Sequence, residues 1–450
     1  MKQKINVGLI GLGTVGSGTL RILTENAELI RNRVGVPINV AKIAVRDLKR
    51  DRGMKLPAGI LTNDPFKVID DPNIDIVVEL IGGYQPAKEL ILGAIARGKH
   101  VVTANKALLA EDGAEIHEAA RRAGVTIGFE ASVGGGIPVI KALKEALAAN
   151  RILSIYGIIN GTSNYILSKM TDEDRPYADV LAEAQKAGYA EADPTFDVGG
   201  IDTAHKLAIL VNLAFGIQVK PDQIFTEGIT SISPLDIDFG KELGYKLKLL
   251  AIAKFHDGSV RGLPGGPDVQ HQIEVRVHPT MVPDEYPIAK VGGVYNAIQL
   301  VGNACEDIML YGRGAGSMPT GSAVVADIMD IGRMILMEPS RKLPGDPAGL
   351  ASDTRVKLQP MDSIRSIYYF RFMALDQPGV LAQISGILGR HRISIAQMIQ
   401  RGRKQGGSVP LVIMTHTALE SDIQKALVEI KALTCIGEEP VLIRVEGEEI

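Results

Sequence analysis

The chain has 450 residues, of which 46% are hydrophobic and 22% are charged, and its formal net charge is −3. This composition is typical of a globular protein of about three domains, and the lack of a long basic run argues against a nucleic-acid partner. The two cysteines are too few for a disulfide framework, and no apolar stretch approaches the roughly 20 residues that span a bilayer, so we expect a cytoplasmic protein without membrane contact.

The N-terminal segment predicts a dinucleotide site. An apolar run over Ile5–Ile10 leads into Gly11, Gly13 and Gly16, and a stretch with helical periodicity follows. In a strand–turn–helix unit, the first glycine permits the turn, the second lets a pyrophosphate approach the backbone, and the third lets the helix pack on the strand. Free N–H groups at the helix start would bind the phosphate charge. The expected cofactor contacts here are Gly11, Gly13, Thr14, Val15 and Gly16. The alternative is a glycine-rich turn without a ligand.

Strands and helices alternate as far as about Ser132, which predicts a doubly wound parallel sheet. Besides a helix from about Pro86 to Arg97, the expected elements are strands at Ile38–Val45, Ile74–Gly83, His100–Lys106 and Val125–Ser132. Ligands bind at the carboxyl edge of such a sheet. The strand ends predicted at this edge are Gly82, Gly83, Thr103 and Asn105, and Thr103 is a predicted cofactor residue.

The second strand ends on Arg46, which bears on the choice of cofactor. An acidic residue near this position binds a ribose 2′-hydroxyl, whereas an arginine suits a 2′-phosphate. Arg46 therefore favours NADP, while the adjacent Asp47 keeps NAD possible. The alternative interpretation of Arg46 is a solvated loop charge.

From about Gly134 to Gly302 the pattern predicts a mixed α+β domain that binds substrate and supports oligomerisation. Its first part reads as a glycine-rich turn and helix over Gly134–Asn150, then a strand, an Asn-Gly turn and a helix over Arg151–Leu167. A further helix should end near Gly188. The alternation of Ile273, Val275 and Val277 predicts a strand at an exposed edge or buried on one face only.

The last third of the chain returns to the nucleotide domain and then forms a separate module. We expect the helical stretch between Tyr311 and Arg341 to pack on the nucleotide domain, and Lys342–Pro360 to be a linker. The segment after it predicts βαββαβ, a ferredoxin-like module. The expected domains are residues 1–133, completed by about 303–341, for nucleotide binding, 134–302 for substrate binding and oligomerisation, 342–363 as linker, and 364–450 as the regulatory module.

A group of charged residues indicates chemistry. Asp202 and Lys206 stand four apart in the helical stretch Ile201–Leu210 and so share a face; the ordinary interpretation is a surface ion pair. Upstream carboxylates surround a proline, namely Glu191, Asp193 and Asp197. An ammonium group needs carboxylate partners, and a reacting carbonyl oxygen needs a proton donor, which a lysine near other charges can supply. The cluster therefore suggests an amino-acid-like substrate.

Two further positions are candidates. Lys106 follows the predicted strand His100–Asn105, which should direct it at the nicotinamide, although it could equally be the first residue of the next helix. The segment Glu130–Pro138 combines a carboxylate with flexible carbonyl groups, a set that can bind a hard cation, although a glycine-rich hinge has the same pattern. His205, beside Lys206, is interpreted as structural.

These segments together resemble the homoserine dehydrogenases. The resemblance covers nearly all of residues 5–340 and is carried by GLGTVG, TANKALL, EASVGGGIP, NGTSNYIL, GYAEADPTFDVGGIDTAHKLAIL and GRGAGSMPTGSAV. It implies NAD(P)-dependent interconversion of L-homoserine and L-aspartate 4-semialdehyde, within threonine, methionine and isoleucine biosynthesis, by a homodimer or homotetramer. The tail from about Tyr368 to Val445 resembles an ACT domain, whose DQPGVLAQI segment often lies beside an amino-acid effector.

The resemblance also implies roles for individual residues. Glu191 and Asp202 correspond to substrate-binding carboxylates, and Lys206 to the proton donor. Lys106 corresponds to a lysine that meets cofactor and substrate and has also been proposed for proton transfer. A monovalent cation, usually sodium, would be bound by Glu130, Val133, Gly135 and Ile137. The cofactor would also contact Gly188 and Gly316. The family often has other residues at Ala192 and an arginine at His205; neither departure removes a charge used above, but the second would change the local field.

A second hypothesis is a nucleotide-holding sensor whose ACT-like tail binds an amino acid without turnover. Lys206 and Lys106 favour the enzyme, because a sensor needs no proton donor. Among enzymes, the alternative is another oxidoreductase of amino-acid metabolism with a similar layout.

Overall fold

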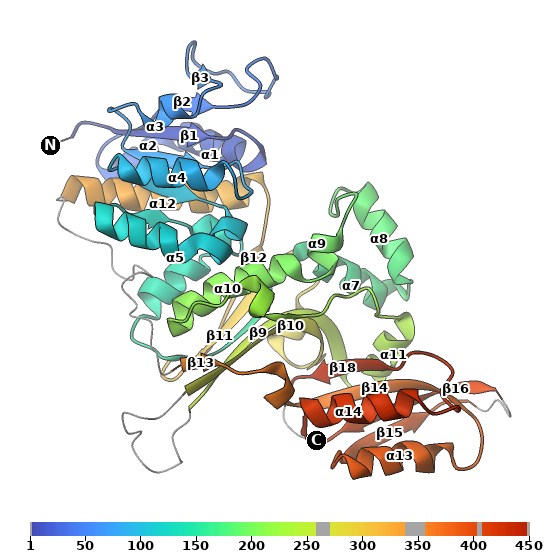
Figure 1. The fold of residues 1–450 in the computed structure, drawn as a ribbon. Coiled ribbons are helices and arrows are strands. Elements are labelled where there is room, and N and C mark those ends of the chain that lie inside the picture. Colours follow the sequence, from blue (N-terminus) through green and yellow to red (C-terminus); the bar gives the residue numbers. More distant parts are fainter. Residues whose placement is uncertain (1, 258–270, 338–355, 403–406, 448–450) are drawn as a thin grey trace. The chain divides into compact units, whose positions relative to one another are not determined.

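The computed structural model describes residues 2–257, 271–337, 356–402 and 407–447, which form two compact units (Figure 1). The first unit takes its described residues from Met1–Ile155, Ala204–Ile224 and Tyr295–Thr354, and the second from Tyr156–Thr203, Phe225–Val294 and Arg355–Ile450. Most of the predicted linker, residues 342–363, lies outside the described residues. Among the helices of the described ranges, none combines the length and the apolar character needed to cross a bilayer.

The first unit contains a six-stranded parallel sheet with the strand order β3-β2-β1-β4-β5-β6. Its strands are β1 (Ile5–Ile10), β2 (Ile38–Ala44), β3 (Leu61–Thr62), β4 (Ile76–Glu79), β5 (His100–Thr103) and β6 (Ile127–Gly128). This order confirms the predicted doubly wound sheet. The strands are shorter than expected. The one predicted over Val125–Ser132 ends early, because the chain turns into a 3₁₀ helix, η1, at Glu130–Ser132.

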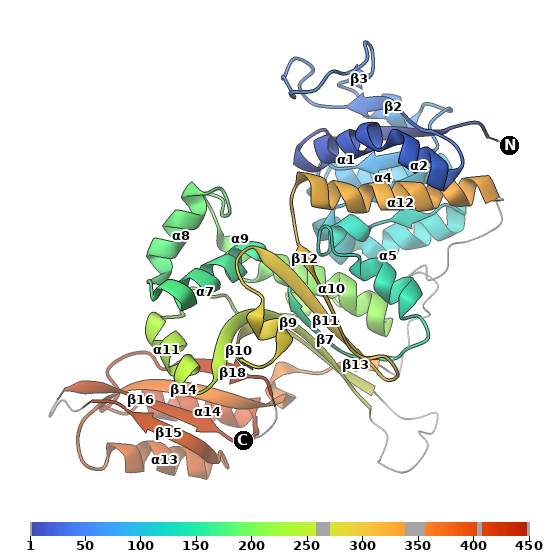
Figure 2. The same cartoon turned by 180° about the vertical axis from the view of Figure 1, so that it is seen from behind.

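Helices cover both faces of this sheet (Figures 1 and 2). They are α1 (Thr14–Glu25), α2 (Ala27–Val34), α3 (Phe66–Ile69), α4 (Ala87–Ala96), α5 (Lys106–Ala123) and α12 (Ser317–Met337). Figure 2 shows α12 alongside α1 and α2, although nearly 300 residues separate them in the chain. Helices α1 and α12 approach closely at two glycines, which have no side chain. A side chain at Gly18 would collide with the backbone of Ser317, and one at Gly321 would collide with the backbone of Gly18. Ser317 Oγ also donates to Thr14 O over 2.7 Å.

The rest of the first unit connects this sheet to a hairpin. Its elements are α6 (Val139–Lys141), the π-helical turn η2 (Ala142–Ala146), the 3₁₀ turn η3 (Pro221–Gln223), β11 (Tyr295–Gly302) and β12 (Glu306–Arg313), the last two paired antiparallel. Strand β7 (Ile152–Ile158) and helix α10 (Ile201–Phe215) begin in one unit and end in the other.

The second unit combines helices with a long antiparallel strand pair. Its first part has α7 (Gly161–Glu173), α8 (Tyr177–Lys186), α9 (Thr195–Val198), β8 (Phe225–Thr226), α11 (Pro234–Glu242), β9 (Tyr245–His256), β10 (His271–Pro283) and η4 (Pro287–Lys290). Strands β9 and β10 pair from Gln272 to Pro283. After β13 (Val356–Leu358) and η6 (Met361–Ser363) the chain enters its C-terminal module.

The C-terminal module has the predicted βαββαβ order. Its elements are β14 (Arg365–Leu375), α13 (Val380–Arg390), β15 (Ile395–Gln400), β16 (Ser408–Thr415), the short β17 (Ala418–Leu419), α14 (Glu420–Lys431) and β18 (Val441–Val445). Both helices cover one face of the sheet, where Phe370 and Phe372 pack against Ile384 and Ile423 (Figure 1). Strand β18 pairs with β14 and also, in parallel, with β10, so one sheet continues through β9-β10-β18-β14-β16-β15.

The prediction that the strand around Ile273–Val277 is buried on one face only was wrong. Every residue of β10 from Ile273 onward is buried. On the second face, Glu274 and Arg276 are covered together with Glu446, which directly follows β18. The polar alternation therefore marks buried charges with partners rather than a solvated face.

Candidate active site

The turn after β1 has the geometry of a phosphate-binding turn. Gly11 has φ +104°, and a side chain at Gly16 would collide with the carbonyl oxygen of Gly11. Gly13 is the N-cap of α1, carries no side chain to cap it, and has open space where a Cβ would stand. The first turn of α1 also lacks an acidic residue, so its N–H groups and its partial positive charge are available to an anion. Thr14 and Val15 are the first two residues of this helix.

A cleft of about 720 Å³ adjoins this turn and contains three arginines, Arg46, Arg50 and Arg52. Arg46 and Arg50 are exposed, whereas Arg52 donates to the carbonyl oxygens of Arg50, over 2.7 Å, and Asp47. Its Nε is buried with no hydrogen-bond partner among the described residues, a donor that a bound anion could use. Only Arg46 was predicted. The signal for the other two was the density of basic residues in RDLKRDR.

At the carboxyl edge of the sheet, Glu79 organises the ends of β4 and β5. Its carboxylate is fully buried and accepts from the amides of Ile81 (2.8 Å) and Gly82 (3.0 Å) and from Thr103 Oγ1 (2.7 Å). Thr103 is itself fully buried, and its Oγ1 accepts from the amide of Asn105 over 3.0 Å. Glu79 was not predicted as a site residue. An acidic residue inside an otherwise apolar strand was its only signal.

Lys106 begins α5, which is capped by Asn105. Asn105 Oδ1 accepts from the amide of Leu108 over 3.2 Å, and its Nδ2 donates to Gly83 O over 2.6 Å. The two interpretations of Lys106 thus coincide: it is a helix-start residue, and it also stands at the carboxyl edge of the sheet. Because the cap is tied to Thr103 and Gly83, the position of the half-buried Lys106 is fixed by the sheet.

The second unit gathers two of the predicted carboxylates around Asn160. Asn160 Nδ2 donates to Asp197 Oδ1 over 2.7 Å and to Asp202 Oδ2 over 2.8 Å. Asp202, in the first turn of α10, is only 3% exposed, and Asp197 lies in the short helix α9. The Asn-Gly turn predicted at Asn160 is instead the start of α7. Asn160 is the N-cap of this helix, and its Oδ1 accepts from the amide of Ser163.

The remaining predicted substrate residues are more exposed. Glu191 is exposed, and so is Gly188, which follows the end of α8. Asp193 accepts from the amide of Thr195 over 3.1 Å, and these hydrogen bonds with Thr195 lower the pKa of its carboxyl. Lys206 is half-buried on α10, one helical turn after Asp202. His205 beside it is buried, as expected of a structural histidine.

The predicted cation segment surrounds a buried carboxylate. Glu130 is 2% exposed and accepts from the amides of Ile140 (2.9 Å) and Lys141 (2.8 Å), while its own amide donates to Asp327 Oδ2 (2.9 Å). Burial and the neighbouring Asp327 raise the pKa of Glu130 to about 7. The other three predicted ligands, Val133, Gly135 and Ile137, are also buried, and the carbonyl of Ile137 accepts from Val139. A buried carboxylate and backbone carbonyl groups are oxygen donors, the ligand type that a hard cation prefers. The predicted cofactor residue Gly316 is exposed, just before α12.

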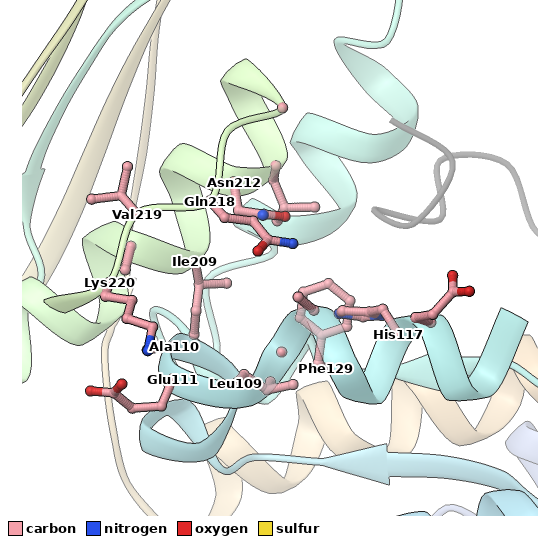
Figure 3. A pocket seen from close by; sticks show the side chains of 16 residues that line it. Leu109, Ala110, Glu111, His117, Phe129, Ile209, Asn212, Gln218, Val219 and Lys220 are labelled. Atoms are coloured by element: carbon pink, nitrogen blue, oxygen red, sulfur yellow. The ribbon is translucent and has the colours of Figure 1, made fainter. Parts of the chain in front are cut away.

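A second cleft, of about 410 Å³, lies between α5 and α10 (Figure 3). The carboxamides of Asn212 and Gln218 lie on one side of it, and His117 packs edge-on against Phe129 on the other, with ring centroids 5.2 Å apart. It contains none of the predicted site residues, although it separates the two helices that carry Lys106 and Lys206.

Comparison with known proteins places the chain in a family. Residues 11–130 match the family model for the NAD-binding domain of homoserine dehydrogenase, residues 138–329 match that for homoserine dehydrogenase, and residues 368–435 match that for the ACT domain. The homoserine dehydrogenase of Pseudomonas aeruginosa is 46% identical over 99% of each chain, and that of Bacillus subtilis 39% identical over 99% of each.

Solved structures agree. The crystal structure of a homoserine dehydrogenase from Thiobacillus denitrificans matches with a TM-score of 0.90 and 48% identity over 98% of each chain. A hyperthermophilic archaeal homoserine dehydrogenase, solved in complex with NADPH, matches with a TM-score of 0.60 and 25% identity over 75% of this chain and 100% of that one. The chain therefore belongs to the homoserine dehydrogenases, NAD(P)-dependent oxidoreductases that interconvert L-homoserine and L-aspartate 4-semialdehyde.

Proposed function

We propose that Asp202, Asp197 and Glu191 hold the amino group of the substrate and that Lys206 donates a proton to the aldehyde oxygen. The observation that carries this proposal is the geometry of α10. Its first turn holds Asp202, which shares a hydrogen-bond donor with Asp197, and Lys206 follows one turn later on the same face. An ammonium group is bound best by ionised partners, and a lysine beside carboxylates is a suitable acid.

The nicotinamide supplies or accepts the hydride when it is bound. As the carbonyl becomes an alcohol, Lys206 gives up one proton at the oxygen, and in the reverse direction it takes that proton back. Lys106 is the second lysine proposed to meet both cofactor and substrate, and the Asn105 cap would hold it at the sheet edge. The test below compares the two lysines.

For the cofactor we propose a preference for NADP. Arg46 is positioned on the same cleft as Arg50 and Arg52, and three guanidinium groups favour a 2′-phosphate. The archaeal relative solved with NADPH supports this choice. Gly11, Gly13, Thr14, Val15 and Gly16 would contact the pyrophosphate, with Gly188, Gly316 and Lys106 as further contacts, while the buried Thr103 would support the sheet edge. Arg46→Ala should weaken NADP binding on the order of tenfold to a hundredfold and leave NAD almost unchanged; equal losses would contradict the 2′-phosphate role.

The remaining assignments are also proposals. We propose that sodium is bound by Glu130, Val133, Gly135 and Ile137, and that an amino acid is the effector at the ACT domain. We further propose that the enzyme is a cytoplasmic homodimer or homotetramer in threonine, methionine and isoleucine biosynthesis, with the domain boundaries predicted above.

Aspartate-semialdehyde-dependent oxidation of NADPH tests the central proposal. Lys206→Ala should lower kcat on the order of a hundredfold to ten-thousandfold while the Kd of NADPH is kept, and Lys106→Ala should be compared with it. Lys425→Ala, on the exposed face of α14, is the matched control. Unchanged turnover in Lys206→Ala would remove this residue from the chemistry. A folded wild-type protein that binds NADPH without any turnover would favour the sensor hypothesis.

A further inference from the structure

The first turn of α7 makes hydrogen bonds to each segment that carries a proposed substrate carboxylate. Asn160 binds the side chains of Asp197 and Asp202, and Ser163 Oγ donates to the carbonyl of Asp197 over 3.1 Å. Thr162 Oγ1 donates to the carbonyl of Tyr189 over 2.7 Å, two residues before Glu191. One helical turn thereby joins three stretches that are separate in the sequence.

The carboxamide of Asn160 uses all of its hydrogens in this arrangement. Its oxygen accepts from the amide of Ser163 over 2.8 Å, which caps the helix, and the two hydrogens of Nδ2 go to two different carboxylates. The side chain is 5% exposed, so water does not compete easily for these bonds. The two bonds from Nδ2 have carboxylate acceptors and are therefore stronger than bonds between neutral groups.

The chemistry of this residue matters because it bridges like charges. Two carboxylates that share one donor repel each other, and an amide holds them in place without neutralising them. A lysine or arginine at this position would hold them as well, but its positive charge would neutralise the negative charge that attracts an incoming ammonium group. A neutral donor adds no positive charge that competes with the ligand.

We propose that Asn160 is a positioning residue that sets Asp197 and Asp202 for the substrate's ammonium group without adding a charge of its own. This inference rests on the proposed function, since it assumes that these carboxylates bind the amino group. It extends that function by assigning a role to a residue that does not itself touch the reacting atoms.

The test is steady-state oxidation of L-homoserine by the full-length enzyme with Asn160→Asp. Aspartate keeps the shape and the cap acceptor for Ser163, but it replaces both donors by an acceptor and adds a third negative charge. The KM for L-homoserine should rise about tenfold to a hundredfold, with kcat changed much less and with the Kd of NADPH unchanged. As the pH is lowered, the introduced carboxyl group binds a proton and can donate again, so kcat/KM of the variant relative to wild type should recover.

Asn160→Ser is the second variant, because serine also caps a helix but cannot reach both carboxylates. It should raise KM without the recovery at low pH. Asn39→Asp makes the same chemical change on the exposed part of β2 and should leave KM unchanged. Thermal unfolding of each variant separates loss of folding from loss of positioning.

Asp202→Asn distinguishes this inference from the proposed function. If Asp202→Asn raises KM but both Asn160 variants keep KM within twofold of wild type, the positioning role is overturned and the substrate site stands. If Asp202→Asn leaves KM unchanged, the proposed substrate site itself is wrong.

Discussion

The two units bury acidic side chains in opposite electrostatic settings. In the first, Glu130 and Asp327 are buried together, and the carboxylate of Glu130 is met by backbone amides. Burial and Asp327 raise the pKa of Glu130 to about 7, and burial raises that of Asp327 to about 6. In the second, burial alone would raise the pKa of Glu274, but the hydrogen bond with His256 and the charge of Arg276 outweigh it and lower that pKa to about 2.

The guanidinium of Arg276 accounts for much of the difference. It is fully buried and donates to Glu274 Oε1 and to Glu446 Oε1, both over 2.7 Å, while Lys254 binds Glu446 over 2.8 Å. In the second unit, Glu274 and Glu446 therefore have buried counter-ions. In the first unit, backbone amides donate to Glu130, and the charge of Lys141 offsets the raised pKa values of Glu130 and Asp327 only in part. A cation from solution at the proposed sodium site could offset the remaining charge.

The largest expected effect comes from removing the buried guanidinium. Arg276→Met should lower the free energy of unfolding by about 3–5 kcal/mol, because it leaves Glu274 and Glu446 buried with Lys254 and His256 as their remaining partners. Urea unfolding at neutral pH measures this loss. Arg122→Met, on an exposed helix face, is the control and should change stability by less than about 0.5 kcal/mol. A loss below about 1 kcal/mol for Arg276→Met would show that Glu274 and Glu446 tolerate the absence of the guanidinium charge.

Acid should weaken the second unit through Glu274. Since its folded-state pKa lies below its ordinary value of 4.5, its contribution is present above pH 4.5 and is lost as the pH falls towards about 2. The contribution is on the order of 3 kcal/mol. Melting temperatures between pH 6 and pH 3 should therefore fall more steeply for wild type than for Glu274→Gln. Parallel curves would mean that Glu274 does not drive the acid response.

The first unit should respond in the opposite direction. Because the folded-state pKa values of Glu130 and Asp327 are raised, their contribution is present at low pH and is lost as the pH rises through about 6 to 7. Glu130→Gln removes the charge but keeps an acceptor for only one of the two amides, because Ile140 and Lys141 donate to different carboxylate oxygens. In sodium-free buffer at pH 8 it should be more stable than wild type by about 2 kcal/mol, as measured by thermal unfolding. A less stable variant at this pH would show that the buried charge of Glu130 does not destabilise the folded protein.

The smallest expected effect is stabilisation by sodium, which tests the proposed cation site directly. At pH 8, sodium chloride should stabilise wild type by about 1 kcal/mol over choline chloride of equal ionic strength, once sodium exceeds its Kd several-fold. Glu130→Gln should show no difference between the two salts. If both proteins respond alike, sodium acts elsewhere.

Local sequence patterns were sufficient for the fold. The Gly11–Gly13–Gly16 spacing, the alternation of strands and helices, and the βαββαβ tail all depend on neighbouring residues, and each was confirmed. What failed was the interpretation of polar residues. Alternation in β10 looked like a solvated face, because the partner of Arg276 is Glu446, 170 residues away.

The same limit applies to the candidate site. Asn160 and Glu79 were missed because their roles come from partners distant in sequence: Asp197 and Asp202 for the first, Thr103 for the second. A lone asparagine before glycine predicts a turn, and a lone acid in a strand predicts nothing definite. The charge pattern of the sequence singled out Glu191, Asp202 and Lys206, and the family resemblance supplied their roles, of which the substitutions above test those of Asp202 and Lys206.

The parallel pairing of β18 with β10 has a consequence for how this architecture can be shortened. A protein cut before the C-terminal module would lose Glu446 from Arg276 and Lys254 and would bare the edge of β10 to other chains. Removal of the module therefore disturbs the part of the second unit that remains. A working short form would need a compensating change at Arg276 and a new cover for that edge, so recombination at this boundary should succeed only when both sides change together.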